Sequence, residues 1–137
     1  MNELVMQVDG AARGNPGPAG IGAVILRGDG KTLGQLSHFI GRATNNVAEY
    51  TALIRALELA QEYGAQDLVI QLDSQLVARQ LQGRYKVKNK ALMPLWKQVQ
   101  KLLSPYCSVR VEQITRSENR RADRLANEAI DAALFGK

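Results

Sequence analysis

A chain of 137 residues, 45% of them hydrophobic, can bury one core, so we predict a single domain over residues 1–137. Its only cysteine, Cys107, excludes an intrachain disulfide and a cysteine-based zinc site, which leaves oxygen ligands for any bound metal ion. The formal charge of +5, from 18 basic and 13 acidic residues, favours a polyanionic partner.

The N-terminal part of the chain predicts three antiparallel strands. Residues 3–9 alternate apolar side chains with other residues, as a strand with one buried face does, and end at Asp9. Residues 10–20 are rich in glycine and proline and predict a loop. Residues 21–27 and 32–40 predict two strands joined by a glycine-containing turn, so a hairpin follows the first strand.

The rest of the chain predicts helices that alternate with two further strands. A helix over residues 46–63 has Gly64 as a candidate C-terminal cap, and a strand over residues 67–73 ends on a carboxylate, Asp73, as the first strand does. After it we expect a helix over residues 74–81, a break at Gly83 and a second helix over residues 89–103. A strand over residues 107–114 and a last helix over residues 119–134 should follow.

This order of elements predicts an α/β fold in which helices cover a mixed sheet. Because a strand–helix–strand step is almost always a right-handed parallel crossover, the fourth strand should lie parallel to the first. Asp9 and Asp73 should then lie at the carboxyl ends of both strands, where such sheets bind ligands. No stretch has the apolar length of a membrane span, and the N-terminus has no leader-like pattern, so we expect a soluble, cytoplasmic protein.

Glu49 has two possible roles in the predicted helix. Asn46 and Glu49 have the spacing of a capping box, in which the carboxylate only closes the start of the helix. At 100° per residue, however, Glu49 falls in the same stripe as Leu53 and Ala56, which should face the sheet. A carboxylate in that stripe needs a positive partner, and the sequence leaves both roles open.

Asp123 lies at the edge of the apolar arc of the last helix, near Ile130, where a partly exposed surface acid is the common alternative. With Asp9, Glu49 and Asp73 it completes a set of four acids near strand ends or core-facing helix stripes. Like charges brought together need neutralisation. Mg²⁺ binds through carboxylates and keeps substrate phosphate in its shell, so the four acids predict metal-dependent phosphoryl chemistry.

A basic tract lies in the second half of the chain. Residues 74–111 contain no acidic residue and eight basic ones, namely Arg79, Arg84, Lys86, Lys88, Lys90, Lys97, Lys101 and Arg110. A solvated helix face is the alternative, but such faces usually mix both signs of charge. The tract therefore favours contact with the phosphates of a nucleic acid.

Four stretches of the sequence resemble ribonuclease H type 1, and the resemblance covers essentially the whole chain. They are Val8-Asp9-Gly10 with residues 14–18, Thr44-Asn45-Asn46 with Glu49, Asp73-Ser74-Gln75, and residues 119–127. The resemblance implies the ribonuclease H fold, a five-stranded mixed sheet with three antiparallel and two parallel strands. It also implies an endonuclease that cuts the RNA strand of RNA/DNA hybrids with two Mg²⁺ or Mn²⁺ ions and leaves 5′-phosphate and 3′-hydroxyl ends.

The resemblance implies roles for individual residues as well. The family's catalytic, metal-binding acids match Asp9, Glu49, Asp73 and Asp123. Its contacts with the minor groove of the hybrid, where the 2′-hydroxyl distinguishes RNA from DNA, match Asn15, Asn45 and Gln75. Its pocket for a phosphate of the DNA strand matches Arg42, Thr44 and Asn89.

The sequence departs from the family at two places. Many members carry a histidine in the loop before the last acid, whereas residues 113–121 have none, and the lone His38 falls in the third predicted strand. Glu118, five residues before Asp123, is the candidate for a proton shuttle there, with an exposed surface acid as the alternative. The basic segment over residues 83–90 is shorter than the basic protrusion of some relatives, so weaker hybrid binding is expected.

Other functions fit the sequence less well. The glycines of residues 10–22 do not form G-x-G-x-x-G, and Gly30-Lys31-Thr32 lacks the earlier glycine of a P-loop, because Ile25 stands there. A catalytically weak hybrid-binding module would gain nothing from four acids. A detached nuclease domain of the reverse-transcriptase type is the nearer alternative. We expect a monomer, and nothing in the sequence implies a protein partner.

Overall fold

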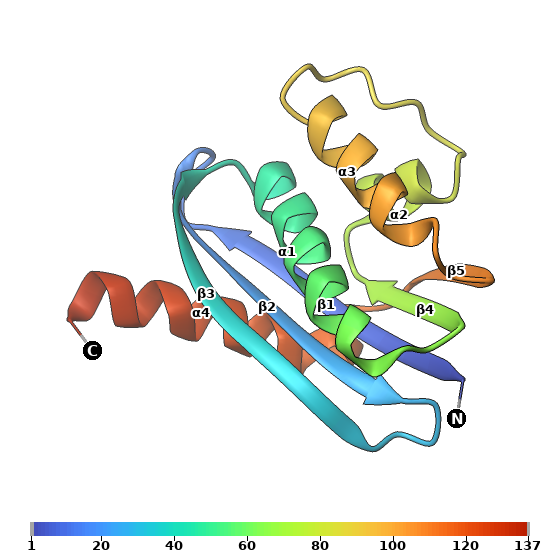
Figure 1. Cartoon of the computed structure of the whole chain (residues 1–137). Helices are drawn as coiled ribbons and strands as arrows, with labels where there is room; N and C mark the ends of the chain where they lie inside the picture. The colour runs from blue at the N-terminus through green and yellow to red at the C-terminus, as the bar shows by residue number, and fades with distance from the viewer. Residues whose placement is uncertain (1, 137) are drawn as a thin grey trace.

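A five-stranded mixed sheet forms the centre of the computed structural model, which describes residues 2–136 (Figure 1). β1 (Glu3–Ala12), β2 (Gly17–Arg27) and β3 (Thr32–Ala43) are neighbouring antiparallel strands. β4 (Asp67–Leu72) pairs in parallel with β1, and β5 (Ser108–Gln113) pairs in parallel with β4, which gives the order β3-β2-β1-β4-β5. The predicted α/β class, with three antiparallel and two parallel strands, is confirmed.

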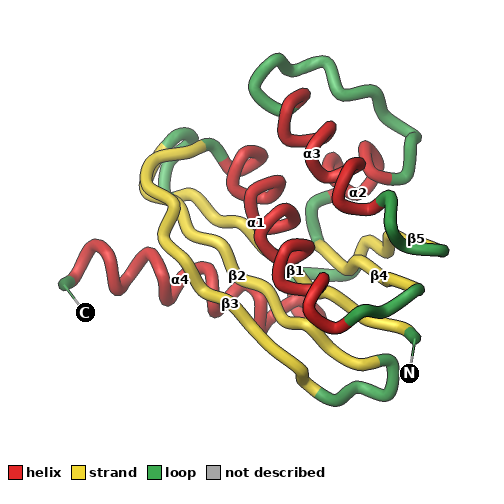
Figure 2. The backbone as a smooth tube through the Cα atoms, viewed as in Figure 1, coloured by secondary structure: helices red, strands yellow, loops and turns green. Residues whose placement is uncertain are grey.

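Helices cover both faces of the sheet (Figures 1 and 2). α1 (Asn45–Ala60) packs against β1 and β2 on one face, and α4 (Arg120–Phe135) crosses the other face against β2, β3 and β1. α2 (Gln75–Leu81) contacts β5, and α3 (Met93–Leu103) packs against α1. Among residues 2–136, no helix is both long enough and apolar enough to cross a membrane.

The main core lies between the sheet and α1. Alternate residues of β1, namely Leu4, Met6 and Val8, are fully buried there with side chains of β2, β4 and α1. On the opposite face of β2, α4 passes directly over Gly22. A Cβ at this position would lie 2.2 Å from a backbone oxygen of α4. Only glycine permits that approach, which brings the first turn of α4, with Asp123, close to the sheet.

The glycine-rich segment over residues 10–20 is largely strand, so the predicted loop is wrong. β1 and β2 extend into it from both sides, and only residues 13–16 turn between them. Its glycines serve close packing, because a Cβ at Gly10 would lie 2.2 Å from the backbone of Ala48 in α1. Asp9 consequently lies within β1 and not at its end, and β3 also extends past its predicted end.

Two predicted helices begin or end elsewhere. The helix predicted from residue 89 starts later, because the Asn89 side chain accepts a hydrogen bond from the backbone NH of Ala91 and forms a turn, and Pro94 occupies the first turn of α3. The helix predicted over residues 46–63 is α1 followed by a short 3₁₀ helix, η1 (Gln61–Tyr63). Gly64 closes η1 in the left-handed conformation expected of a cap.

Candidate functional site

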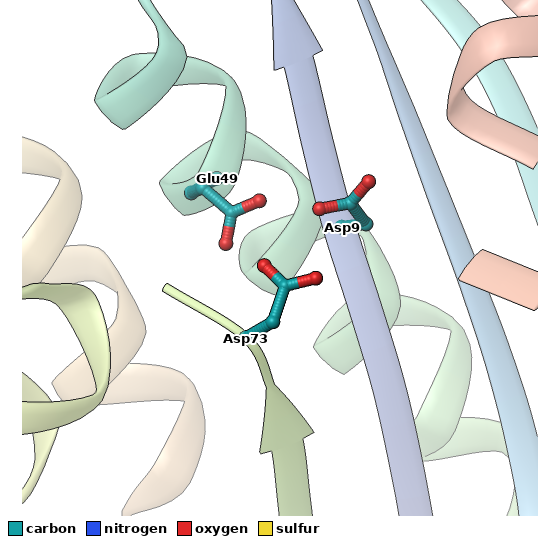
Figure 3. Close-up of side chains that lie close together, drawn as sticks. All are labelled: Asp9, Glu49 and Asp73. Atoms are coloured by element: carbon teal, nitrogen blue, oxygen red, sulfur yellow. The ribbon is translucent and has the colours of Figure 1, made fainter. Parts of the chain in front are cut away.

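Three carboxylates from three different elements point toward one another (Figure 3). Asp9 comes from β1, Glu49 from the start of α1, and Asp73 directly follows β4. One carboxylate oxygen of each residue lies within 4.8 Å of those of the other two. Asp9 and Glu49 are buried, and Asp73 is half-buried. The fold therefore brings together three of the four predicted acids in a largely buried cluster.

Glu49 is buried against β1 and does not cap its own helix. Its Oε1 accepts a hydrogen bond from the backbone NH of Gly10. Thr44, not Asn46, caps α1, because Thr44 Oγ1 accepts from the backbone NH of Val47. The capping-box alternative is therefore wrong. The second oxygen of Glu49, Oε2, is buried and finds no hydrogen-bond partner among residues 2–136, which is unfavourable unless a cation or water is supplied.

Asp123 lies on the same cleft as the other acids, with a side chain that is 30% exposed. Asn127 Nδ2 lies 3.3 Å from its Oδ1, and the guanidinium of Arg116 lies 3.9 Å from it. The cleft has a volume of about 430 Å³, and it is lined by Asp9, Gly10, Ala11, Ala12, Arg13, Asn45, Asn46, Glu49, Asp73, Ser74, Arg116, Asp123 and Asn127. All four predicted acids thus line one cleft.

The cluster holds its protons more tightly than isolated carboxylates do. Burial, followed by the negative charge of Glu49, raises the pKa of Asp9 well above its ordinary value. Burial also raises the pKa of Glu49, although its hydrogen bonds with Asp9 and with the NH of Gly10 lower it in part. Burial raises the pKa of Asp73 as well. Without a cation, the protein has to keep some of these groups protonated to avoid repulsion between them.

The donor set of the cleft fits a hard divalent cation. All the candidate ligands are carboxylate oxygens, which Mg²⁺ and Mn²⁺ prefer to nitrogen and sulfur. The unpaired Oε2 of Glu49 and the raised pKa values both indicate negative charge that the surrounding protein does not balance. A cation held by Asp9, Glu49 and Asp73 would supply that balance.

We expect the metal-free protein to lose stability as the pH rises from about 5 to about 9. A carboxyl whose pKa is raised by folding stabilises most below its unfolded pKa of about 4, and this contribution declines as the pH approaches the folded pKa. The unfolding midpoint in chelator should fall across this range, and Mg²⁺ should raise the midpoint more at the alkaline end. Asp9→Asn should flatten the decline. A midpoint that rises with pH in wild-type protein contradicts this electrostatic account.

The predicted minor-groove contacts lie in and beside the cleft. Asn45 lines the cleft, and its backbone NH donates to Asn15 Oδ1 at 3.0 Å, so the two residues are neighbours. Asn45 Oδ1 accepts from the backbone NH of Ala12, also at 3.0 Å. Gln75 is exposed at the start of α2, two residues after Asp73.

The residues predicted to hold a phosphate of the DNA strand lie outside the lining of the cleft. Arg42 is exposed on β3, Thr44 caps α1, and Asn89 is exposed in the turn before α3. The lysines of the basic tract, Lys86, Lys88 and Lys90, are exposed in the segment between α2 and α3. Contact of these residues with phosphate stays a prediction.

Glu118 lies in the short 3₁₀ helix η2 (Ser117–Asn119) and does not line the cleft. Its carboxylate accepts hydrogen bonds from the backbone NH and the hydroxyl of Thr115, at 2.8 and 2.9 Å, and these bonds lower the pKa of Glu118. A carboxylate held in this way is a weak proton acceptor, so the geometry favours the surface-acid alternative.

Glu118→Gln is therefore expected to leave kcat on an RNA/DNA hybrid within about twofold of wild type, measured under single-turnover conditions. General acid–base assistance is typically worth about 10²-fold or more. A loss of that size without a change in hybrid affinity would establish the proton-shuttle role that the sequence predicted.

Other residues of the cleft were missed by reasoning from the sequence. In the sequence Arg116 is only one of several basic residues in a loop, but in the structure its guanidinium lies beside Asp123. Asn127 lies one helical turn after Asp123 on α4, and that spacing was the available signal. Arg13 lies 3.3 Å from the side-chain oxygen of Asn127 and forms an ion pair with Asp131 at 2.7 Å, which ties the β1–β2 turn to α4.

Known proteins resemble this chain over most of its length. A family profile described as reverse transcriptase-like matches residues 7–129. The bifunctional protein Rv2228c of Mycobacterium tuberculosis is 48% identical over 132 residues, which are 96% of this chain and 36% of that protein. Ribonuclease H of Nitrosomonas eutropha is 33% identical over an alignment that covers 100% of this chain and 95% of that protein.

A solved structure agrees with these sequence relationships. LC11-RNase H1, isolated from compost by a metagenomic approach, was crystallised in complex with an RNA/DNA hybrid and superimposes on this chain with a TM-score of 0.91. The two proteins are 46% identical, and the match covers 96% of this chain and 99% of the other. The resemblance predicted from the sequence is confirmed: the chain belongs to the ribonuclease H family.

Proposed function

We propose that this chain is an endonuclease that hydrolyses the RNA strand of RNA/DNA hybrids with divalent metal ions. The observation that carries the proposal is the cluster of Asp9, Glu49 and Asp73, whose oxygens lie within 4.8 Å of one another in an open cleft. A relative of the same fold, LC11-RNase H1, was solved with such a hybrid bound, which supports the substrate class. Cleavage should leave 5′-phosphate and 3′-hydroxyl ends.

We assign the metal-binding and catalytic role to the four acids of the cleft. Asp9, Glu49, Asp73 and Asp123 would hold two Mg²⁺ or Mn²⁺ ions, which when bound supply an activated water and stabilise the leaving oxygen. Arg116, beside Asp123, adds a positive charge at the edge of the cleft where phosphate would enter.

Recognition of the hybrid is assigned to the amides beside the cleft. The side-chain oxygen of Asn15 accepts from the backbone NH of Asn45, and that of Asn45 accepts from the backbone NH of Ala12, so each NH₂ group can donate to base edges in the minor groove. Gln75 is the first residue of α2, two residues after Asp73, and would contact the hybrid in the same groove. Arg42, Thr44 and Asn89 are assigned to a phosphate of the DNA strand.

The proposal is tested by incubating the protein with labelled RNA/DNA, RNA/RNA, DNA/DNA and single-stranded RNA in Mg²⁺ or Mn²⁺. We expect cleavage of the RNA strand in the hybrid, at a rate well above that for the other three substrates. Binding of the hybrid without cleavage would favour the alternative of a hybrid-binding module. A monomer and a cytoplasmic location stay predictions.

Neutralising Lys86, Lys88 and Lys90 together should weaken hybrid binding and reduce its dependence on salt. Each phosphate contact that is lost removes up to about one unit from the slope of log K against log salt. Affinity is measured from about 50 to 300 mM salt in Ca²⁺ or chelator, so that cleavage does not interfere. Neutralising Arg55, an exposed residue on α1 that pairs with Glu58, is the control. An unchanged slope in the triple variant would assign the lysines to a solvated surface.

A further inference from the structure

Asn119 is a fully buried polar residue at the junction of η2 and α4, and the function proposed above gives it no role. Its neighbours in η2, Ser117 and Glu118, are exposed. Asn119 occupies the N-cap position of α4, but within the described part of the chain its side chain makes no capping hydrogen bond. Asparagine is favoured at N-caps because its side chain accepts from the first turn, so the contact made here replaces a favourable local one.

The side chain of Asn119 reaches the point where β1 and β4 separate. Parallel pairing of these strands ends at Gln7 and Gln71. Val8 is the next residue of β1, and its carbonyl oxygen accepts a hydrogen bond from Asn119 Nδ2 at 2.8 Å. Asp9 follows Val8 directly, so this bond holds the backbone that carries the first acid of the cluster.

The segment that leads to Asn119 is tied to the end of β4 as well. The backbone NH of Ile114 donates to the carbonyl oxygen of Leu72 at 2.9 Å, and Asp73 follows Leu72. Residues 114–119 therefore bridge the gap between the strands that carry Asp9 and Asp73.

The second polar atom of Asn119 argues against a role in packing alone. Its Oδ1 is buried and has no hydrogen-bond partner among residues 2–136. An unpaired buried acceptor is unfavourable, and an apolar side chain of similar volume would avoid that penalty. An amide is thus less favourable than an apolar side chain for filling this space. Its NH₂ group, which donates to Val8, is the part that forms a hydrogen bond.

We propose that Asn119 is a positioning residue that fixes the separation of Asp9 and Asp73, and so sets the affinity of the acid cluster for its divalent cation. It acts through the Val8 carbonyl and through the hydrogen bond that ties the segment before it to Leu72, and not by touching the substrate. Polar groups that orient metal ligands typically change metal affinity or activity by about 10- to 100-fold when removed. This inference rests on the metal-dependent function proposed above.

The test compares Asn119→Leu, which keeps the number and branching of the side-chain heavy atoms but removes both polar atoms, with wild-type protein. Mg²⁺ affinity is measured by calorimetry without substrate, and kcat and KM are measured on the hybrid below the unfolding midpoint of each protein. We expect Mg²⁺ affinity and kcat each to fall by about 10-fold or more, with KM changed by less than about twofold. Asn119→Ala gives the same comparison if the leucine variant does not fold.

Gln80→Leu is the matched control, because Gln80 is also a buried amide, 5% exposed, but its side chain accepts from the hydroxyl of Tyr50 and lies outside the cleft. It should lower the unfolding midpoint and leave Mg²⁺ affinity at the wild-type value. Asn119 variants that lower only the midpoint would overturn the proposal. The Mg²⁺ titration uses no substrate, so it decides the role of Asn119 even if the wild-type protein fails to cut the hybrid.

Discussion

Asp9→Asn is expected to reduce turnover of an RNA/DNA hybrid by about 10³-fold or more while the protein stays folded. The substitution keeps the shape of the side chain but removes the charge at the centre of the cluster, where Asp9 interacts with Glu49 and Asp123. In chelator near neutral pH the variant should unfold at a higher temperature than wild type, because folding no longer has to protonate a carboxyl whose pKa is raised by burial and by Glu49. Turnover is measured with enzyme in excess, and stability by thermal unfolding.

Asp29→Asn provides the matched control for this result. Asp29 undergoes the same chemical change, but it is exposed in the β2–β3 turn and pairs with Arg27 at 2.6 Å. Its variant should cut the hybrid at the wild-type rate. If Asp9→Asn retained more than about a tenth of wild-type turnover, Asp9 would have to be removed from the catalytic set.

Gly10→Ala should lower the free energy of unfolding by about 3 kcal/mol or more. The new Cβ would lie 2.2 Å from the backbone carbon of Ala48 and 2.4 Å from the backbone nitrogen of Glu49, and backbone atoms cannot rotate away as a side chain can. α1 would have to move from β1. Because Glu49 Oε1 accepts from the NH of Gly10, the molecules that remain folded should also lose activity.

Gly28→Ala separates this effect from the general cost of replacing glycine. The nearest atom to a Cβ at Gly28 is a side-chain oxygen of Glu3 at 3.3 Å, which can move. Unfolding in urea should give a change of less than about 1 kcal/mol for this variant. If both variants lost a similar amount of unfolding free energy, β1 and α1 would have to lie farther apart at Gly10 than in the structure.

The antiparallel strands and the parallel fourth strand could be predicted from the sequence, but the ends of the strands could not. Alternation of apolar side chains identifies each strand, and the handedness of crossovers gives the parallel pairing of β4 with β1. Gly10 and Gly20, however, look locally like loop residues. Their actual role is to allow the backbones of α1 and α4 to approach the sheet. Contacts with helices distant in sequence cannot be inferred from the residues next to these glycines.

The acids of the cleft were predictable because each breaks a local pattern. Asp9 and Asp73 end runs of alternating apolar residues in the sequence, and Glu49 lies in the core-facing stripe of its helix. The roles of Arg116 and Asn119 were not predictable in this way. Asn119 acts on Val8, 111 residues earlier in the chain, and the hydrogen bond exists only once β5 and η2 have brought the two together.

If the acid cluster hydrolyses the RNA strand of a hybrid only when divalent cations are bound, removing and restoring the metal should stop and restart cleavage. The most direct test is cleavage of a hybrid labelled on its RNA strand by one preparation, first with metal, then after complete chelation, and finally after Mg²⁺ is restored. We expect cleavage in the first and third reactions and none in the second, with Asp9→Asn nearly inactive throughout. Cleavage by wild-type protein that continues at the same rate after complete chelation would contradict it.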